Sequence, residues 1–182
     1  DIVVGYPSAD RGAIARLAAD EKLASRVTLM IDDVAQLDYV DAVVAPNKRA
    51  VIRVALELDA SYRSRALGHV GVRRSPVFTP AQAEALAEAV IARRGFRLVG
   101  VMAYEAQIAG VTNAGPRKAG IRAMQRASAR ELAGRRGEAV RRVREIVELE
   151  FVNGGGTGSI ESTHADPSVT EVELTQTLPD IV

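Results

Sequence analysis

The sequence contains no cysteine and no tryptophan, and aromatic residues make up only 4% of its 182 residues. Without cysteine the chain can form no disulfide, and thiolate catalysis and cysteine-based metal sites are excluded. No apolar run approaches the roughly 18 residues that a membrane-spanning helix needs. No basic leader precedes the first apolar run, Asp1–Tyr6. We therefore expect a cytoplasmic protein with no membrane partner, and a fragment of a longer chain because it opens directly on a strand.

The chain also lacks an excess of either charge. Its 24 basic and 23 acidic residues give a net charge of +1. One expected helix carries a basic face, formed by Arg135, Arg136, Arg141, Arg142 and Arg144. Interleaved glutamates neutralise this face, and no aromatic residues lie between the arginines to stack on bases. We expect a solvated helix and no nucleic-acid partner.

Apolar runs alternate with amphipathic stretches along the whole sequence. The expected strands are residues 1–6, 27–31, 51–58, 98–103, 151–152 and 169–172. The expected helices are residues 11–25, 34–39, 80–94 and 117–147, the last with a potential break at Gly134. Thr79 caps the third helix, with Pro80 at its first position and Gln82 completing a capping box. Alternating strands and helices with near-continuous apolar strands predict an α/β fold with a parallel sheet.

A glycine-rich motif follows the fifth expected strand, with the sequence Asn-Gly-Gly-Gly-Thr-Gly-Ser over residues 153–159. Glycine permits positive φ and close approach of the backbone to a ligand. Successive amides in such a turn form an anion-binding nest, and Thr157 and Ser159 add hydroxyl donors. The motif indicates a phosphate site, and a flexible glycine turn is the alternative.

Polar residues end four of the expected strands or follow them directly: Asp32, Asp59, Tyr104 and Asn153. Both a β/α barrel and an open parallel sheet place their active sites at this edge. Five or six strand–helix units are too few for a closed eight-stranded barrel, which needs about 250 residues. The pattern leaves two alternatives, an open sheet and a piece of a barrel.

Two further polar pairs have weaker functional interpretations. Asp32 and Asp33 form a carboxylate pair, but adjacent acids before a helix usually serve as a cap. His164 with Asp166 suggests a metal or acid–base pair, but a polar turn is the better interpretation in this Ser/Thr-rich stretch. We expect no metal site in the chain.

Four segments in order suggest a family: residues 56–59 (Leu-Glu-Leu-Asp), 68–72 (Gly-His-Val-Gly-Val), 95–105 and 154–159. Together they resemble the fold-type III pyridoxal-phosphate enzymes, which share the alanine racemase barrel. The similarity is to the D-threonine aldolase and D-serine dehydratase branch, including amino acid deaminase/aldolase proteins. The resemblance implies a partial TIM (β/α)8-type barrel with about six parallel strands alternating with helices. Residues 1–172 would be the family's barrel strands three to eight, and residues 173–182 an irregular tail.

The resemblance also implies roles for individual residues. Gly155, Gly156, Thr157, Gly158 and Ser159 would cradle the phosphate of pyridoxal 5'-phosphate. Tyr104 would pack on the face of the pyridine ring, and Asn153 would contact the phosphate or cap the turn. His69 occupies the position of an arginine that, in relatives, lies near the phenolic oxygen of the cofactor or the substrate carboxylate. A structural histidine and an ordinary strand-end tyrosine are the alternatives for His69 and Tyr104.

The implied activity is retro-aldol cleavage or β-elimination of D-hydroxy amino acids through a lysine Schiff base. The lysines here are Lys22, Lys48 and Lys118, and none ends an expected strand. The resemblance therefore places the reactive lysine upstream of Asp1, and we expect no catalytic residue within the chain and no activity from it alone. In the family a divalent metal belongs to a C-terminal domain, and the intact enzymes form homodimers. A non-catalytic pyridoxal-phosphate binder and an open-sheet nucleotide- or phosphosugar-binding domain are the alternative functions.

Overall fold

The computed structural model describes residues 1–64, 68–105, 118–155, 163 and 165–172, with only the backbone described at 118–122 and 172. The strands are β1 (Ile2–Val4), β2 (Val27–Ile31), β3 (Ile52–Glu57), β4 (Tyr62–Ser64), β5 (Gly68–Val70), β6 (Phe96–Ala103), β7 (Phe151–Gly154) and β8 (Glu171–Val172). The helices are α1 (Arg11–Ala19), α2 (Glu21–Ala24), α3 (Val34–Val43), the short 3-10 helix η1 (Pro46–Lys48), α4 (Pro80–Ile91) and α6 (Lys118–Ile146). The predicted tail, residues 173–182, lies outside the described residues.

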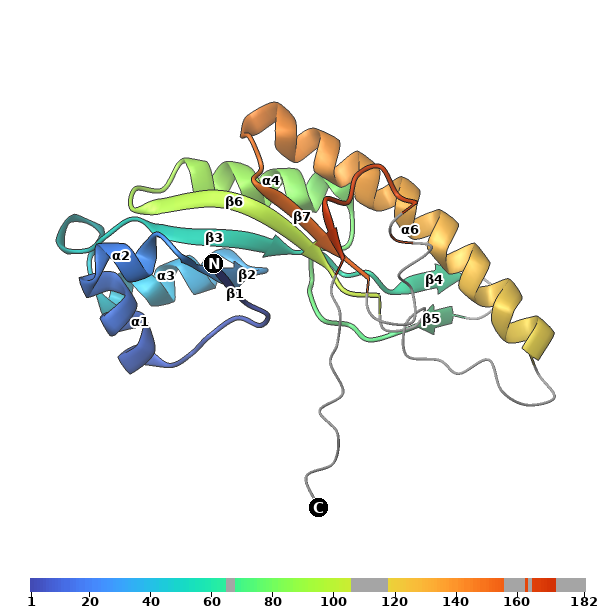
Figure 1. Cartoon of the computed structure of the whole chain (residues 1–182), viewed down its shortest axis with the longest axis horizontal. Helices are drawn as coiled ribbons and strands as arrows, with labels where there is room; N and C mark the ends of the chain where they lie inside the picture. The colour runs from blue at the N-terminus through green and yellow to red at the C-terminus, as the bar shows by residue number, and fades with distance from the viewer. Residues whose placement is uncertain (65–67, 106–117, 156–162, 164, 173–182) are drawn as a thin grey trace, which may run out of the picture.

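Six strands form one parallel sheet in the order β1-β2-β3-β6-β7-β8 (Figure 1). The strands cross the sheet in chain order, whereas a doubly wound open sheet changes direction at a switch point. The sheet curls into an incomplete cylinder. The fold is therefore a partial TIM-type β/α barrel, as the sequence resemblance predicted, and the open-sheet alternative is wrong.

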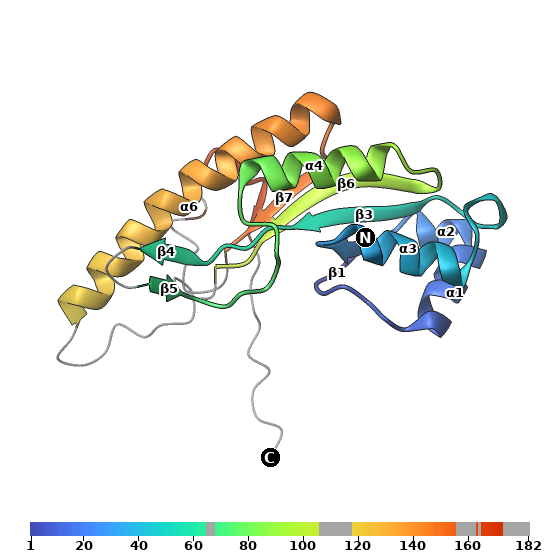
Figure 2. The same ribbon diagram turned by 180° about the vertical axis from the view of Figure 1, so that it is seen from behind.

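The two faces of the sheet bury different sets of side chains. On the outer face, α4 and α6 cover β6 and β7, and α1, α2 and α3 gather at the β1–β3 end (Figures 1 and 2). Apolar residues of these helices and strands form the main core, which includes Leu37, Leu56, Leu86 and Val140. The inner face holds a smaller cluster drawn from strands alone: Met30, Ala55, Val99, Met102 and Phe151. This separation is that of a barrel, with strands inside and helices outside.

Local capping signals set most helix starts. Thr79 and Gln82 form the predicted capping box of α4, and Asp33 forms another with Gln36 at the start of α3. The structural interpretation of Asp33 is thus confirmed. The predicted helix 11–25 is wrong as one element, because the Asp20 carboxylate accepts hydrogen bonds from the amides of Lys22 and Leu23 and starts a second helix.

Two other elements differ from the sequence prediction. The stretch between β3 and α4, expected to be a loop, contains the antiparallel hairpin β4–β5, in which Tyr62 pairs with Val70. Helix α6 continues through Gly134 without a break. Among the helices that the structure describes, none combines the length and apolarity that crossing a lipid bilayer requires.

Candidate functional site

The carboxyl ends of the parallel strands meet at one edge of the sheet, as the sequence predicted. Met102 pairs with both Glu57 and Asn153, and Gly154 pairs with Ala103. Tyr104 directly follows β6 and Gly155 directly follows β7. Three adjacent strands, β3, β6 and β7, therefore present Glu57, Tyr104, Asn153 and Gly155 on neighbouring positions of this edge.

Tyr104 lies on the inner side of the half-barrel, where it packs against the strand-only cluster of Met30, Ala55, Val99, Met102 and Phe151. Its ring is partly buried. An aromatic ring held in this way offers a flat apolar surface with a polar tip at the mouth of the half-barrel. The position suits the ring-packing role that the resemblance implies, and that role stays a prediction.

Arg74 is a residue of this edge that sequence reasoning missed. Its Nε donates a 2.5 Å hydrogen bond to Oε1 of Glu57, a carboxylate with 0% exposure, and its Nη2 donates to the carbonyl of Gly5 at 2.8 Å. The guanidinium carbon lies 4.3 Å from the centre of the Tyr6 ring and 5.0 Å from that of Tyr104. Because aromatic faces attract cations, these two rings and the carboxylate fix one guanidinium at the mouth. The doublet Arg73-Arg74 was the only sequence signal.

Asn153 and the glycines after it begin the predicted phosphate site. Oδ1 of Asn153 is buried and has no hydrogen-bond partner in the described part of the chain. Gly155 has a φ of 78°, which glycine adopts without steric cost. Gly156, Thr157, Gly158 and Ser159 lie outside the described residues. A buried acceptor left without a partner is costly, so Oδ1 of Asn153 suits a hydrogen-bond donor on a bound group.

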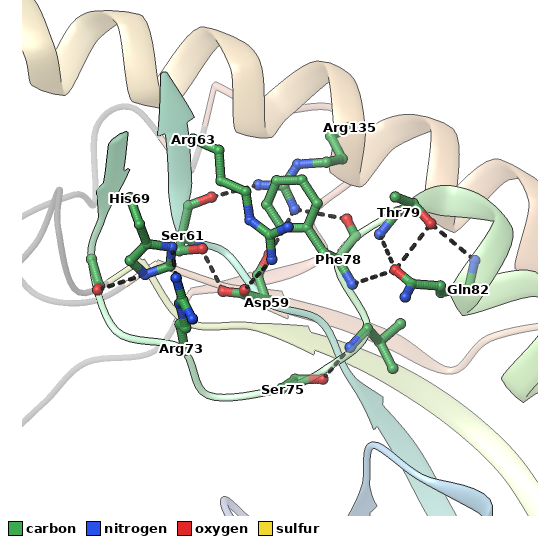
Figure 3. Close-up of polar contacts among 12 residues, drawn as sticks. Asp59, Ser61, Arg63, His69, Arg73, Ser75, Phe78, Thr79, Gln82 and Arg135 are labelled. Carbon is green, nitrogen blue, oxygen red and sulfur yellow. Dashed lines mark hydrogen bonds and ion pairs between the residues drawn. The ribbon is translucent and has the colours of Figure 1, made fainter. Parts of the chain in front are cut away.

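His69 lies on the hairpin strand β5 (Figure 3). Arg73 Nε is 3.4 Å from Nδ1 of His69, and Nε2 of His69 is 3.1 Å from the carbonyl oxygen of Gly71. A guanidinium can only donate, so Nδ1 of His69 accepts the hydrogen bond from Arg73. Nε2 therefore carries the ring proton and donates a hydrogen bond to the carbonyl oxygen of Gly71. His69 is thereby oriented within the hairpin, whereas Arg74 is the cation that lies over Tyr104.

The hairpin and the end of β3 are held by Arg135 of α6 (Figure 3). Its guanidinium donates to the carbonyls of Asp59 at 2.6 Å, Phe78 at 3.0 Å and Ser61 at 2.9 Å. Asp59, one of the strand-end carboxylates, accepts a 2.9 Å hydrogen bond from the amide of Ser61. Asp59 therefore shapes the turn after β3.

The next residue of α6, Arg136, is buried at 2% exposure and binds two carboxylates, Glu105 and Asp166. The prediction of a solvated basic face is thus wrong for Arg136 and for Arg135, whose side chain is 10% exposed, although Arg141 is 55% exposed as expected. Asp166 belongs to the His164–Asp166 pair. Its carboxylate binds Arg136 and Ser168, while His164 lies outside the described residues. In the described part of the chain, no three His, Asp or Glu residues are grouped as metal ligands.

The lysines that the structure describes lie away from the site edge. Lys22 is in α2, just before the amino end of β2, and Lys48 is in η1, just before β3. The backbone of Lys118 opens α6, and its side chain is outside the described residues. Neither Lys22 nor Lys48 therefore stands at the carboxyl ends of the strands.

Comparison with models of protein families gives no match, and comparison with curated proteins gives none. Solved structures do match. A D-threonine aldolase from Filomicrobium marinum has a TM-score of 0.71 and 20% identity, over 96% of this chain and 42% of that one. A D-threo-3-hydroxyaspartate dehydratase from Delftia sp. HT23 has a TM-score of 0.64 and 22% identity, over 96% and 41%. An alanine racemase from E. faecalis has a TM-score of 0.60 and 12% identity, over 94% and 38%.

The chain has the fold of these enzymes. The similarity to fold-type III enzymes that four sequence motifs predicted is confirmed at the level of the fold. The chain spans about two fifths of the length of the solved structures it matches. The matched part is the partial barrel with its carboxyl edge, where the glycine motif begins.

Proposed function

We propose that the chain is the phosphate-binding half of a pyridoxal-phosphate enzyme that cleaves D-hydroxy amino acids or eliminates their β-hydroxyl group. The partial barrel it forms occurs in a D-threonine aldolase and in a D-threo-3-hydroxyaspartate dehydratase, which supports this class of reaction. When bound, the cofactor would supply an electron sink for cleavage of a bond at the α-carbon of the substrate.

The convergence of three features on one edge carries the proposal. These are the left-handed turn at Gly155, the partly buried ring of Tyr104, and the guanidinium of Arg74 beside that ring. A cofactor with a phosphate and an aromatic ring needs all three kinds of partner: amide donors, an aromatic face and a cation. Amides from Gly155 to Ser159 would hold the phosphate, and Asn153 would contact it through its Nδ2, since phosphate oxygens only accept.

Arg74 fills the role that the resemblance gives to an arginine near the phenolic oxygen or the substrate carboxylate. His69 stands at that arginine's sequence position, but its ring is oriented by Arg73 and Gly71 on the hairpin. Glu57 holds the Arg74 guanidinium in place, because a buried carboxylate accepts its hydrogen bond. The Arg74 guanidinium is therefore already fixed in position, so an anionic ligand at the mouth would bind it without a rearrangement of the side chain.

The location of the lysines favours binding of the cofactor without catalysis for the chain by itself. Lys22 and Lys48 lie before the amino ends of strands, so neither can reach a cofactor at the carboxyl edge. We expect the 182-residue chain to bind pyridoxal phosphate without a covalent bond and without turning over D-amino acids. A chain that only stores or carries the cofactor would show the same behaviour.

A titration monitored by circular dichroism in the cofactor's absorption band tests the proposal. Pyridoxal phosphate is achiral, so a signal in that band reports an ordered protein-bound ring. We expect a saturable signal with pyridoxal phosphate and at least tenfold weaker binding of pyridoxal, which lacks the phosphate. Tyr104→Leu should reduce the signal, and Arg142→Lys, whose side chain pairs with Glu84 of α4 and Glu138 of α6, should not. No signal, or tighter binding of glucose 6-phosphate in competition, would show that the site serves another phosphate ester.

A further inference from the structure

Arg136 lies in the middle of α6, the most basic helix of the chain, yet its side chain is 2% exposed. It forms an ion pair with Glu105, and its Nε and Nη2 donate to Oδ2 of Asp166 at 3.1 and 2.7 Å. Glu105 and Asp166 are themselves 2% and 5% exposed. Three charged groups are thus enclosed together, with no role yet assigned to them.

Both carboxylates belong to segments that border the predicted phosphate site. Glu105 follows β6 and accepts a 3.0 Å hydrogen bond from Thr163 Oγ1. Asp166 lies between β7 and β8, and its Oδ1 accepts from the amide of Ser168 at 2.9 Å and from its hydroxyl at 2.6 Å. Arg136 therefore ties the exit of β6 to the segment that returns from the glycine motif.

The guanidinium also packs against the point where the glycine motif leaves the sheet. A Cβ placed on Gly154 would lie 2.7 Å from Arg136 Nη1, closer than real contacts allow. The Gly154 backbone therefore rests on the guanidinium, and the left-handed turn at Gly155 follows at once. Arg136 contacts the first glycine of the motif, Gly154, and through Glu105 and Asp166 it is tied to Thr163 and Ser168 beyond the motif.

Stability alone is a poor reason for such a cluster. Removing one arginine and two carboxylates from water costs free energy, and well-packed apolar residues of similar volume often stabilise a core equally well. A planar guanidinium with hydrogen bonds in several directions instead fixes its partners in one arrangement. The cluster suits a place where backbone atoms must be held in a defined position.

We infer that Arg136 is a positioning residue for the phosphate site, holding Gly154 and Gly155 in the arrangement that binds a phosphate monoester. This inference rests on the proposed function, since it takes the turn at Gly155 as the start of that site. The guanidinium acts through the backbone of Gly154 and the residues tied to Glu105 and Asp166, and it does not touch the ligand.

The test compares the affinities of the full 182-residue chain for pyridoxal phosphate and for pyridoxal. Arg136→Lys keeps the charge but loses the planar fork. We expect it to weaken pyridoxal phosphate binding about tenfold and to leave pyridoxal binding unchanged, so the ratio of the two affinities falls. The matched control is Arg142→Lys on the same helix, whose ion pairs with Glu84 and Glu138 lie away from the motif. Arg142→Lys should leave the ratio of the two affinities unchanged, even if it lowers the urea concentration at which half of the protein is unfolded.

Each outcome has one meaning. If the wild-type chain binds both ligands equally or neither, the proposed function is overturned. If the wild type prefers the phosphorylated ligand and Arg136→Lys keeps the same ratio, the positioning role is overturned. Should Arg136→Lys fail to fold, Thr163→Val carries the test, because it removes one hydrogen bond to Glu105 while nearly keeping the side-chain shape. An unchanged ratio in that variant would likewise refute the role.

Discussion

The ring of Phe151 fills the space in which a side chain at Gly100 would begin. A Cβ at position 100 would lie 2.5 Å from Cε2 of Phe151. The register between β3 and β6 shifts at this point, with Val54 opposite Leu98 and Ala55 opposite Gly100. The extra residue in β6 forms a bulge, which bends the strand and increases its twist. Glycine therefore lets β6 curl around the inner cluster.

Gly100→Ala should destabilise the chain by about 1–3 kcal/mol, the usual range for overpacking a core. Urea unfolding followed by far-ultraviolet circular dichroism measures this. Gly137→Ala is the control, because nothing lies within 4 Å of a Cβ at that helical position. It should stabilise by about 0.5–1 kcal/mol. Equal effects of the two substitutions would contradict the packing described for β6.

Arg74→Met should be more damaging, because it leaves the buried carboxylate of Glu57 without its arginine partner. Breaking a buried pair in this way costs about 3–5 kcal/mol. The double variant Arg74→Met with Glu57→Gln also removes the carboxylate charge that Arg74 balances, so it should recover a large part of that loss. The urea midpoints of the single and double variants give the answer. If the double variant were the less stable of the two, the pairing would not be the source of the effect.

Local signals explain what the sequence predicted well. Thr79 and Gln82 lie three residues apart and cap α4 without help from the rest of the chain. The strands β2, β3 and β6 were found because each is a near-continuous apolar run in which most residues are buried. The curl of the sheet came from the family resemblance, since apolar periodicity alone fits an open sheet equally well.

The residues that were missed depend on distant partners. Arg136 looks like any surface arginine of a helix, and its burial depends on Glu105 and Asp166, which are 31 and 30 positions away. Arg74 likewise finds Glu57 17 positions before it and Gly5 near the start of the chain. The hairpin β4–β5 was missed because its strands have only three residues each, too few to show an alternating pattern.

The stability of the chain should fall in acid through Asp166. Burial by itself would raise the pKa of this carboxyl, but hydrogen bonds from Ser168 and Arg136 outweigh burial and hold the pKa below its usual range. A lowered folded-state pKa gives stability that is present above the unfolded value of about 3.9 and is lost as pH falls through the folded value. Asp166→Asn should therefore differ most from wild type above about pH 4, with the difference shrinking below it. Thermal unfolding from pH 2 to 7 measures this, and a constant difference would contradict the ionised cluster.

Reduction with borohydride tests the expectation of non-covalent binding. The chain is incubated with stoichiometric pyridoxal phosphate, reduced and mapped by mass spectrometry. We expect only scattered low-level labelling, because Lys22 and Lys48 lie before the amino ends of β2 and β3. A stoichiometric adduct on one lysine, abolished by changing that lysine to arginine, would show that the chain supplies its own Schiff-base residue.

The central claim is that the turn after β7 binds a phosphate monoester. Nitrogen–proton correlation spectra of the nitrogen-15-labelled chain test this claim most directly. At 19.4 kDa the protein suits this measurement. Titration with pyridoxal phosphate should shift the amide signal of Gly155 saturably and before signals on the outer helices, and pyridoxal at the same concentrations should not. If the Gly155 signal stays in place while amides elsewhere move, or if pyridoxal moves it equally, the phosphate site is not where this account puts it.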